Sequence, residues 1–106
     1  DYGAHRDAIA VPSNFGHVDL PAVLTQLAQR GVNEVQVEAG PGLSGAFLKQ
    51  GLVDEILLYI APVILGDAAK PLFSDINIEQ MSQRFNFSIL ENTNIGGDIR
   101  LLLRKK

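Results

Sequence analysis

Apolar residues recur over positions 20–28 at i, i+3, i+4, i+7 and i+8, which places them on one stripe of an amphipathic helix. Asp19 is a suitable N-cap for this helix, and Pro21 is tolerated in a first turn. Gly31 lies where a helix commonly ends. These positions predict the best helix of the chain, with a stripe made of Leu20, Val23, Leu24, Leu27 and Ala28.

Shorter apolar segments around this helix predict an alternation of strands and helices. Residues 8–11 are a strand candidate, and residues 35–37 predict a strand that ends near Glu38. Residues 43–50 predict a second, shorter helix. Residues 55–60 are almost continuously apolar, as in a strand that is covered on both faces of a parallel sheet. The order therefore predicts an α/β unit of the βαβ type with right-handed crossovers.

The last part of the chain has a different pattern. Residues 67–83 are mostly irregular, with one helical turn predicted at 78–82. Residues 85–89 and 99–103 alternate between apolar and polar, with a turn at Gly96-Gly97 between them. This pattern predicts an antiparallel hairpin whose first arm carries a bulge or bend. The predicted fold is thus a mainly parallel sheet with flanking helices, extended by a C-terminal antiparallel hairpin.

Composition limits the class of protein. A chain of 106 residues forms one domain or part of one, and it buries roughly two thirds of its unfolded surface. With 46% hydrophobic and 20% charged residues, it has the composition of an ordinary soluble globular chain. The net charge of −3 offers no overall positive field to nucleic acid, and we expect the basic residues 104–106 to form a solvated tail.

The sequence also lacks the patterns of disulfide-rich and membrane proteins. It has no Cys, which excludes a disulfide framework and a thiolate metal site and fits a reducing compartment such as the cytoplasm. No apolar run approaches the roughly 20 residues needed to cross a bilayer. Because the chain starts at Asp1 rather than Met and shows no signal-peptide pattern, we expect it to be a fragment of a longer protein.

The segment from Glu38 to Ala46 carries the clearest indication of chemistry. It follows a predicted strand and opens a predicted helix. The unpaired N–H groups and the positive dipole end of such a helix favour phosphate. Glycines at positions 40, 42 and 45 let a ligand approach backbone that a Cβ would block.

Two interpretations of this segment stay open from the residues alone. The glycines match G-x-G-x-x-G, but the acidic residue that a Rossmann fold places about 20 positions later is missing from the end of the next strand. Phosphate binding and a purely structural turn are therefore equally good interpretations. Glu38 is the acid at the tip of a predicted central strand, where α/β proteins bind ligands. By its position alone, a solvated carboxylate is the better interpretation.

Other polar residues predict little chemistry. His5 and His17 have no further ligand at metal spacing, which argues against a zinc site. Ser13 and Ser44 have no partner base for acyl transfer. The neighbouring acids at positions 54–55 enter a predicted strand, so their side chains are expected on opposite faces.

Several motifs follow one another in a specific order: Val35-Gln36-Val37-Glu38-Ala39-Gly40-Pro41, Gly45-Ala46-Phe47-Leu48, Gly51-Leu52-Val53-Asp54-Glu55, Tyr59-Ile60-Ala61-Pro62, Leu65-Gly66 and Gly97-Asp98-Ile99-Arg100-Leu101. In this order and spacing they resemble the reductase domain of the bifunctional deaminase–reductases of riboflavin biosynthesis. The similarity extends from about Ala8 to Leu103, which is nearly the whole chain.

The resemblance implies a dihydrofolate-reductase-like α/β fold. It implies hydride transfer from NADPH to the ribosyl carbon of 5-amino-6-(5-phosphoribosylamino)uracil, which opens the sugar to a ribityl chain. Because the hydride chemistry belongs to the cofactor, we predict no catalytic acid in this chain. The lack of ligands at metal spacing predicts no metal site. The resemblance implies that Glu38 contacts the substrate. It also implies that the NADPH phosphates are lined by Gly40, Pro41, Gly42, Leu43, Ser44, Gly45 and Ala46.

The chain departs from the family at several points. Gly42 stands where members often carry Thr or Ser, and Ala39 replaces a common Gly. The family's reductase domain is considerably longer, and the zinc-deaminase motifs H-x-E and P-C-x-x-C are absent from this sequence. We therefore expect the isolated chain to have little or no activity.

Two other functions stay open. The first is another dihydrofolate-reductase-like NADPH reductase that acts on a different pterin or pyrimidine. The second is a non-enzymatic interaction module whose glycine turn is only structural. Residues 55–60 are expected to be core or a subunit contact, and we expect a homodimer without membrane or nucleic-acid partners.

Overall fold

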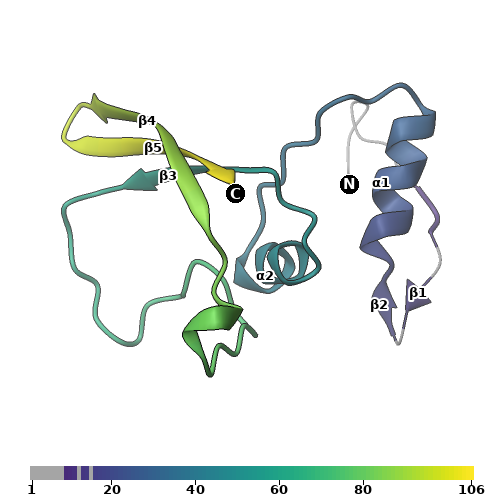
Figure 1. Cartoon of the computed structure of the whole chain (residues 1–106), viewed down its shortest axis with the longest axis horizontal. Coiled ribbons are helices and arrows are strands. Elements are labelled where there is room, and N and C mark those ends of the chain that lie inside the picture. Colours follow the sequence, from purple (N-terminus) through teal and green to yellow (C-terminus); the bar gives the residue numbers. More distant parts are fainter. Residues whose placement is uncertain (1–8, 12, 15) are drawn as a thin grey trace, which may run out of the picture. The chain divides into compact units, whose positions relative to one another are not determined.

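The computed structural model describes residues 9–11, 13–14 and 16–106, which belong to two compact units, Asp1–Gln36 and Val37–Lys106. The first unit contains β1 (Ser13–Asn14), β2 (His17–Val18) and α1 (Leu20–Gln29). The second contains α2 (Pro41–Lys49), β3 (Glu55–Ile60), the 3₁₀ helix η1 (Met81–Gln83), β4 (Phe87–Ile95) and β5 (Asp98–Lys105) (Figure 1). The predicted helical turn at 78–82 overlaps η1 only at residues 81–82, since η1 begins three residues later than predicted.

In the first unit, α1 confirms the helix predicted from the hydrophobic stripe. The Asp19 carboxylate accepts a hydrogen bond from the Ala22 N–H at 3.1 Å, as an N-cap does. Gly31 follows the helix with a φ of 86°, a left-handed conformation that glycine adopts without steric cost. The strand predicted at 8–11 is not found at residues 9–11, and Ala8 lies outside the described residues. Strands β1 and β2, which the hydrophobic pattern does not predict, form a short antiparallel pair.

In the second unit, α2 begins two residues before its predicted start and ends as predicted near Gly51. Gly51 has a φ of 71°, and its N–H donates to the Leu48 carbonyl at 3.1 Å. The next N–H, of Leu52, donates to the Phe47 carbonyl at 3.0 Å, so the last turn of the helix is capped by the chain that leaves it. Phe47 and Leu48 are buried and anchor this end of α2.

The sheet of the second unit has three strands in the order β3-β5-β4, with β5 in the middle (Figure 1). Strands β4 and β5 form the predicted hairpin, with the turn at Gly96-Gly97. The predicted irregularity of the first arm is confirmed, because the register shifts between Ile89 and Glu91. Glu55 of β3 lies opposite Arg104 of β5, and the two side chains form a salt bridge.

The α/β composition is therefore confirmed, but the prediction of a mainly parallel sheet is wrong for the described residues. Strand β3 runs antiparallel to β5, because an apolar run indicates that a strand is covered and says nothing of its direction. The strand predicted at 35–37 is also wrong, since these residues adopt no regular structure. Val35 and Val37 are 46% and 40% exposed, and no described strand pairs with them.

Several large apolar residues are exposed on the two faces of the sheet. Leu20, Phe47 and Leu48 are the buried apolar residues among those that the structure describes. On the sheet, Leu57, Tyr59 and Ile89 are at least half exposed. Leu57 and Tyr59 share one face of β3, whereas Ile89 lies opposite Leu103, which pairs with Ile56, and so belongs to the other face.

Candidate functional site

The start of helix α2 presents free amide groups. The N-cap Gly40 is extended, and it forms no side-chain capping bond because it has no side chain. The first helical hydrogen bond joins the Ser44 N–H to the Gly40 carbonyl at 3.1 Å. The N–H groups of Gly42 and Leu43 therefore have no partner within the helix, and Pro41 has no N–H. Two donors and the positive end of the helix dipole thus face the same space.

The space in front of this helix start is open. A Cβ added at Gly40 would meet no described atom within 4 Å. A Cβ added at Gly42 would meet only the Ser74 Oγ, at 3.9 Å. Leu43 is 46% exposed. An anion can therefore approach the amides directly, which is the condition for phosphate binding at a helix N-terminus.

One side of α2 is covered by a loop formed by residues 71–76. The Ser74 N–H donates to the Pro41 carbonyl at 3.1 Å, and the Lys49 Nζ donates to the Asp75 carbonyl at 3.0 Å. Between these two points, Gly45 lies against Ser74. Positions 41, 45 and 49 are four residues apart, so the loop follows one face of the helix.

Gly45 is a glycine because of this contact. A Cβ at position 45 would lie 2.3 Å from the Ser74 carbonyl oxygen and 3.2 Å from the Ser74 nitrogen, both of them backbone atoms. Gly45 is buried, whereas Gly40 and Gly42 are exposed. The three glycines of the G-x-G-x-x-G pattern thus have two roles: two leave the helix start open, and the third allows a loop to pack closely.

The remaining predicted residues of this segment lie around the same helix start. Ser44 is half-buried, and its hydroxyl donates to the Ala39 carbonyl at 3.4 Å, which ties the first turn to the chain that enters it. Ala46 is half-buried. Glu38 is exposed and lies two residues before the N-cap, in the same compact unit. The structure therefore brings Glu38 to the approach of the helix start, on irregular chain rather than at a strand tip.

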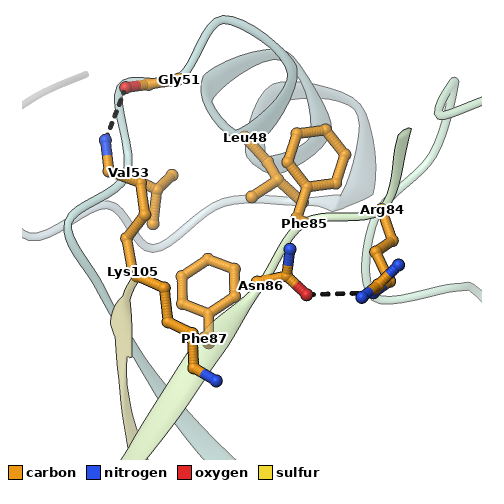
Figure 2. A pocket seen from close by; sticks show the side chains of 9 residues that line it. Leu48, Gly51, Val53, Arg84, Phe85, Asn86, Phe87 and Lys105 are labelled. Carbon is orange, nitrogen blue, oxygen red and sulfur yellow. Dashed lines mark hydrogen bonds between the residues drawn. The ribbon is translucent and has the colours of Figure 1, made fainter. Parts of the chain in front are cut away.

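A pocket in the second unit lies at the other end of α2. It has a volume of about 250 Å³, slightly below the range of roughly 300–1,000 Å³ that is usual for ligand sites. Figure 2 shows two hydrogen bonds among the lining residues: the Lys105 Nζ donates to the Gly51 carbonyl, and the Arg84 Nε donates to the Asn86 Oδ1. The described lining residues include none of the predicted site residues; they are Leu48, Gly51, Val53, Arg84, Phe85, Asn86, Phe87, Lys105 and Lys106.

Neither a metal cluster nor a membrane span is present in the described part of the chain. Its residues contain no group of three or more His, Cys, Asp or Glu side chains that could hold a metal ion. None of the described helices has the length and apolar character that crossing a membrane requires. His5 lies outside the described residues, and His17 belongs to β2.

Sequence reasoning missed Ser74, which the structure brings next to the predicted segment. Ser74 lies in a stretch without periodicity, so no local pattern marks it. The one feature of the sequence that could have indicated this contact was the glycine at position 45, inside the predicted helix. A glycine inside a helix costs about 1 kcal/mol relative to Ala, and a close backbone approach is a common reason for one.

Solved structures of one bacterial protein are similar to this chain in fold. Acinetobacter baumannii RibD matches in two forms, with TM-scores of 0.78 and 0.75 and 36% sequence identity. The first match covers 86% of this chain and 27% of that protein's chain. This chain thus shares its fold with part of the RibD protein.

Sequence comparisons agree with the structural match. RibD of Escherichia coli K12 is 39% identical over 95 residues, which make up 90% of this chain and 26% of that protein. A Buchnera aphidicola protein (subsp. Acyrthosiphon pisum) named 5-amino-6-(5-phosphoribosylamino)uracil reductase is 39% identical over 89 residues, or 84% of this chain and 43% of that protein. The model of the RibD C-terminal domain matches residues 4–101. The chain belongs to the RibD C-terminal domain family, and it spans about a quarter of the RibD relatives and under half of the reductase.

Proposed function

We propose that the protein carrying this chain reduces 5-amino-6-(5-phosphoribosylamino)uracil with NADPH, in riboflavin biosynthesis. Membership of the RibD C-terminal domain family supports the reaction, because a relative with 39% identity bears the name of this reductase. The observation that carries the proposal within this chain is the open, uncapped start of α2 behind Gly40. In the complete protein we propose that the fold is dihydrofolate-reductase-like.

The cofactor is proposed to bind with its phosphates at the start of α2. The N–H groups of Gly42 and Leu43 have no hydrogen-bond partner within the helix. The space beside Gly40 is open, because a Cβ at this position would meet no described atom within 4 Å. Pro41 fixes the first turn, and Ser44 holds it to the entering chain. Gly45 lets the loop 71–76 pack closely on the helix behind this front, and Gly45 and Ala46 are proposed to complete the lining of the phosphates.

Glu38 is proposed to contact the substrate. Its carboxylate can accept hydrogen bonds from the hydroxyl or amino groups of a ribosylaminopyrimidine, and an ionised acceptor makes such bonds roughly twice as strong as neutral ones. It lies two residues before the N-cap Gly40, so a substrate held there is close to a cofactor held by the first turn. NADPH supplies the hydride when it is bound, and these residues supply position and charge.

We also propose that the protein is a cytoplasmic homodimer. Leu57 and Tyr59 lie on β3, at one edge of the sheet, and are 50% and 56% exposed. Uncovered apolar residues on an edge strand favour pairing with another chain. Light scattering after gel filtration tests the dimer, and a monomer at all concentrations would contradict it.

The reaction is tested with the full-length protein, NADPH and the ribosylaminopyrimidine substrate. We expect consumption of NADPH that depends on the pyrimidine, together with a product whose sugar is opened to a ribityl chain. A pterin serves as the competing substrate. Turnover of the pterin but not of the ribosylaminopyrimidine would mean that the substrate is a pterin. Failure to bind NADPH at saturating concentration would mean that the cofactor assignment is wrong as well.

A further inference from the structure

Ser74 places a hydroxyl group beside the helix start. Its Oγ lies 3.9 Å from the position that a Cβ of Gly42 would occupy. Gly42 also carries one of the two N–H groups that have no helical partner. The residue is half-buried, so part of it is accessible to a ligand. A hydroxyl from a distant loop therefore lies beside the first turn of α2, next to the residue that carries one of these amides.

The backbone of Ser74 holds this hydroxyl in place. The N–H of Ser74 donates to the Pro41 carbonyl at 3.1 Å, and the carbonyl of Ser74 packs on Gly45. The next residue, Asp75, has a φ of 60°, which is uncommon for a residue other than glycine, and its carbonyl accepts a hydrogen bond from the Lys49 Nζ. The loop is thus attached to α2 on both sides of the Ser74 side chain.

None of these attachments uses the Ser74 hydroxyl. The contacts with Pro41 and Gly45 are made by backbone atoms of Ser74, and an alanine would make them equally well. The packing of the loop therefore does not explain why a hydroxyl stands at this position. A serine hydroxyl has one donor hydrogen, and a phosphate oxygen beside the helix amides is a strong acceptor for it.

We propose that Ser74 binds the same phosphate-bearing cofactor as the start of α2, by donating its hydroxyl hydrogen to a phosphate oxygen. This inference rests on the proposed function, and it adds to that site a residue from outside the glycine-rich segment. The loop 71–76 then has two roles: its backbone packs against the helix, and its serine side chain contributes to holding the anion.

The test is a binding titration of the full-length protein with NADPH, followed by the change in nicotinamide fluorescence. Ser74→Ala removes the hydroxyl and keeps the backbone contacts, whereas Ser74→Thr keeps a hydroxyl. Ser82→Ala is the matched control, because Ser82 is an exposed serine of η1 outside the helix start. Thermal unfolding without NADPH is measured for all variants.

We expect Ser74→Ala to raise the Kd for NADPH about tenfold, the usual effect of losing a hydrogen bond to a charged group. Ser74→Thr and Ser82→Ala should bind within about twofold of the wild type, and the melting temperature without NADPH should be unchanged in Ser74→Ala. If Ser74→Ala binds NADPH as the wild type does, the inference is wrong and the proposed function stands. The inference is equally wrong if Ser74→Thr binds as weakly as Ser74→Ala. If the wild type itself does not bind NADPH, both fail.

Discussion

Gly45 of helix α2 and Ser74 of the loop 71–76 are in direct contact. The Ser74 carbonyl oxygen lies 2.3 Å from the point where a Cβ of residue 45 would be, a distance that no real Cβ contact tolerates. The contact joins a helix to a loop that is remote in sequence. It also explains a glycine in the interior of a helix, where glycine is otherwise unfavourable.

Replacing Gly45 by Ala should destabilise the protein. The added Cβ has to displace the backbone of Ser74 rather than a flexible side chain, and overpacking of this kind costs about 1–3 kcal/mol. Urea unfolding should show a lower midpoint with an unchanged slope. Gly97→Ala is the control, because a Cβ at Gly97 meets no described atom within 4 Å. Equal stability of Gly45→Ala and the wild type would mean that the loop does not pack on the helix as described.

Replacing Gly42 by Asp should strengthen the fold and weaken cofactor binding. An acidic residue in the first turn interacts favourably with the helix dipole, by about 0.3–1 kcal/mol. The same negative charge repels a phosphate at the free amides, so the Kd for NADPH should rise at least about tenfold. Gly42→Asn has nearly the same shape without the charge and should raise the Kd much less. Tight NADPH binding by Gly42→Asp would show that the phosphates bind elsewhere.

Replacing Glu38 by Gln should affect the substrate and leave the cofactor unaffected. The neutral amide loses the ionised acceptor, so kcat/KM for the ribosylaminopyrimidine should fall about tenfold while the Kd for NADPH stays the same. Glu34→Gln is the control, since Glu34 is exposed and precedes the proposed site in sequence. A weaker affinity for NADPH with unchanged kinetics for the substrate would assign Glu38 to the cofactor instead.

Replacing Asp19 by Ala should cost roughly 1 kcal/mol of unfolding free energy. The carboxylate accepts the hydrogen bond of the Ala22 N–H, and loss of an N-cap leaves that donor without its acceptor. Asp19→Ser should restore most of the stability, because serine is an equally good N-cap. Catalysis should be unchanged at temperatures where all three forms are folded. If alanine and serine at this position are equally stable, capping does not contribute.

The sequence determined the features of this protein that depend on neighbouring residues. The stripe at positions 20–28 with its Asp19 cap and the hairpin turn at Gly96-Gly97 are present where the pattern predicts them, and α2 begins within two residues of its predicted start. In each of these, the helical or strand period and the capping or turn residue lie within one short segment of the chain, so a local pattern is enough to predict them.

Tertiary structure alone decided how these pieces pair. The apolar run of β3 indicated a strand but not its direction, and antiparallel pairing with β5 became evident only from the hydrogen-bonding partner. Residues 35–37 alternate as a strand does, yet no described neighbour pairs with them. The position of Ser74 beside Gly42 depends on a loop that folds back onto α2. Contacts between segments far apart in the chain leave no period in the sequence, which is the physical reason that this part could not be predicted.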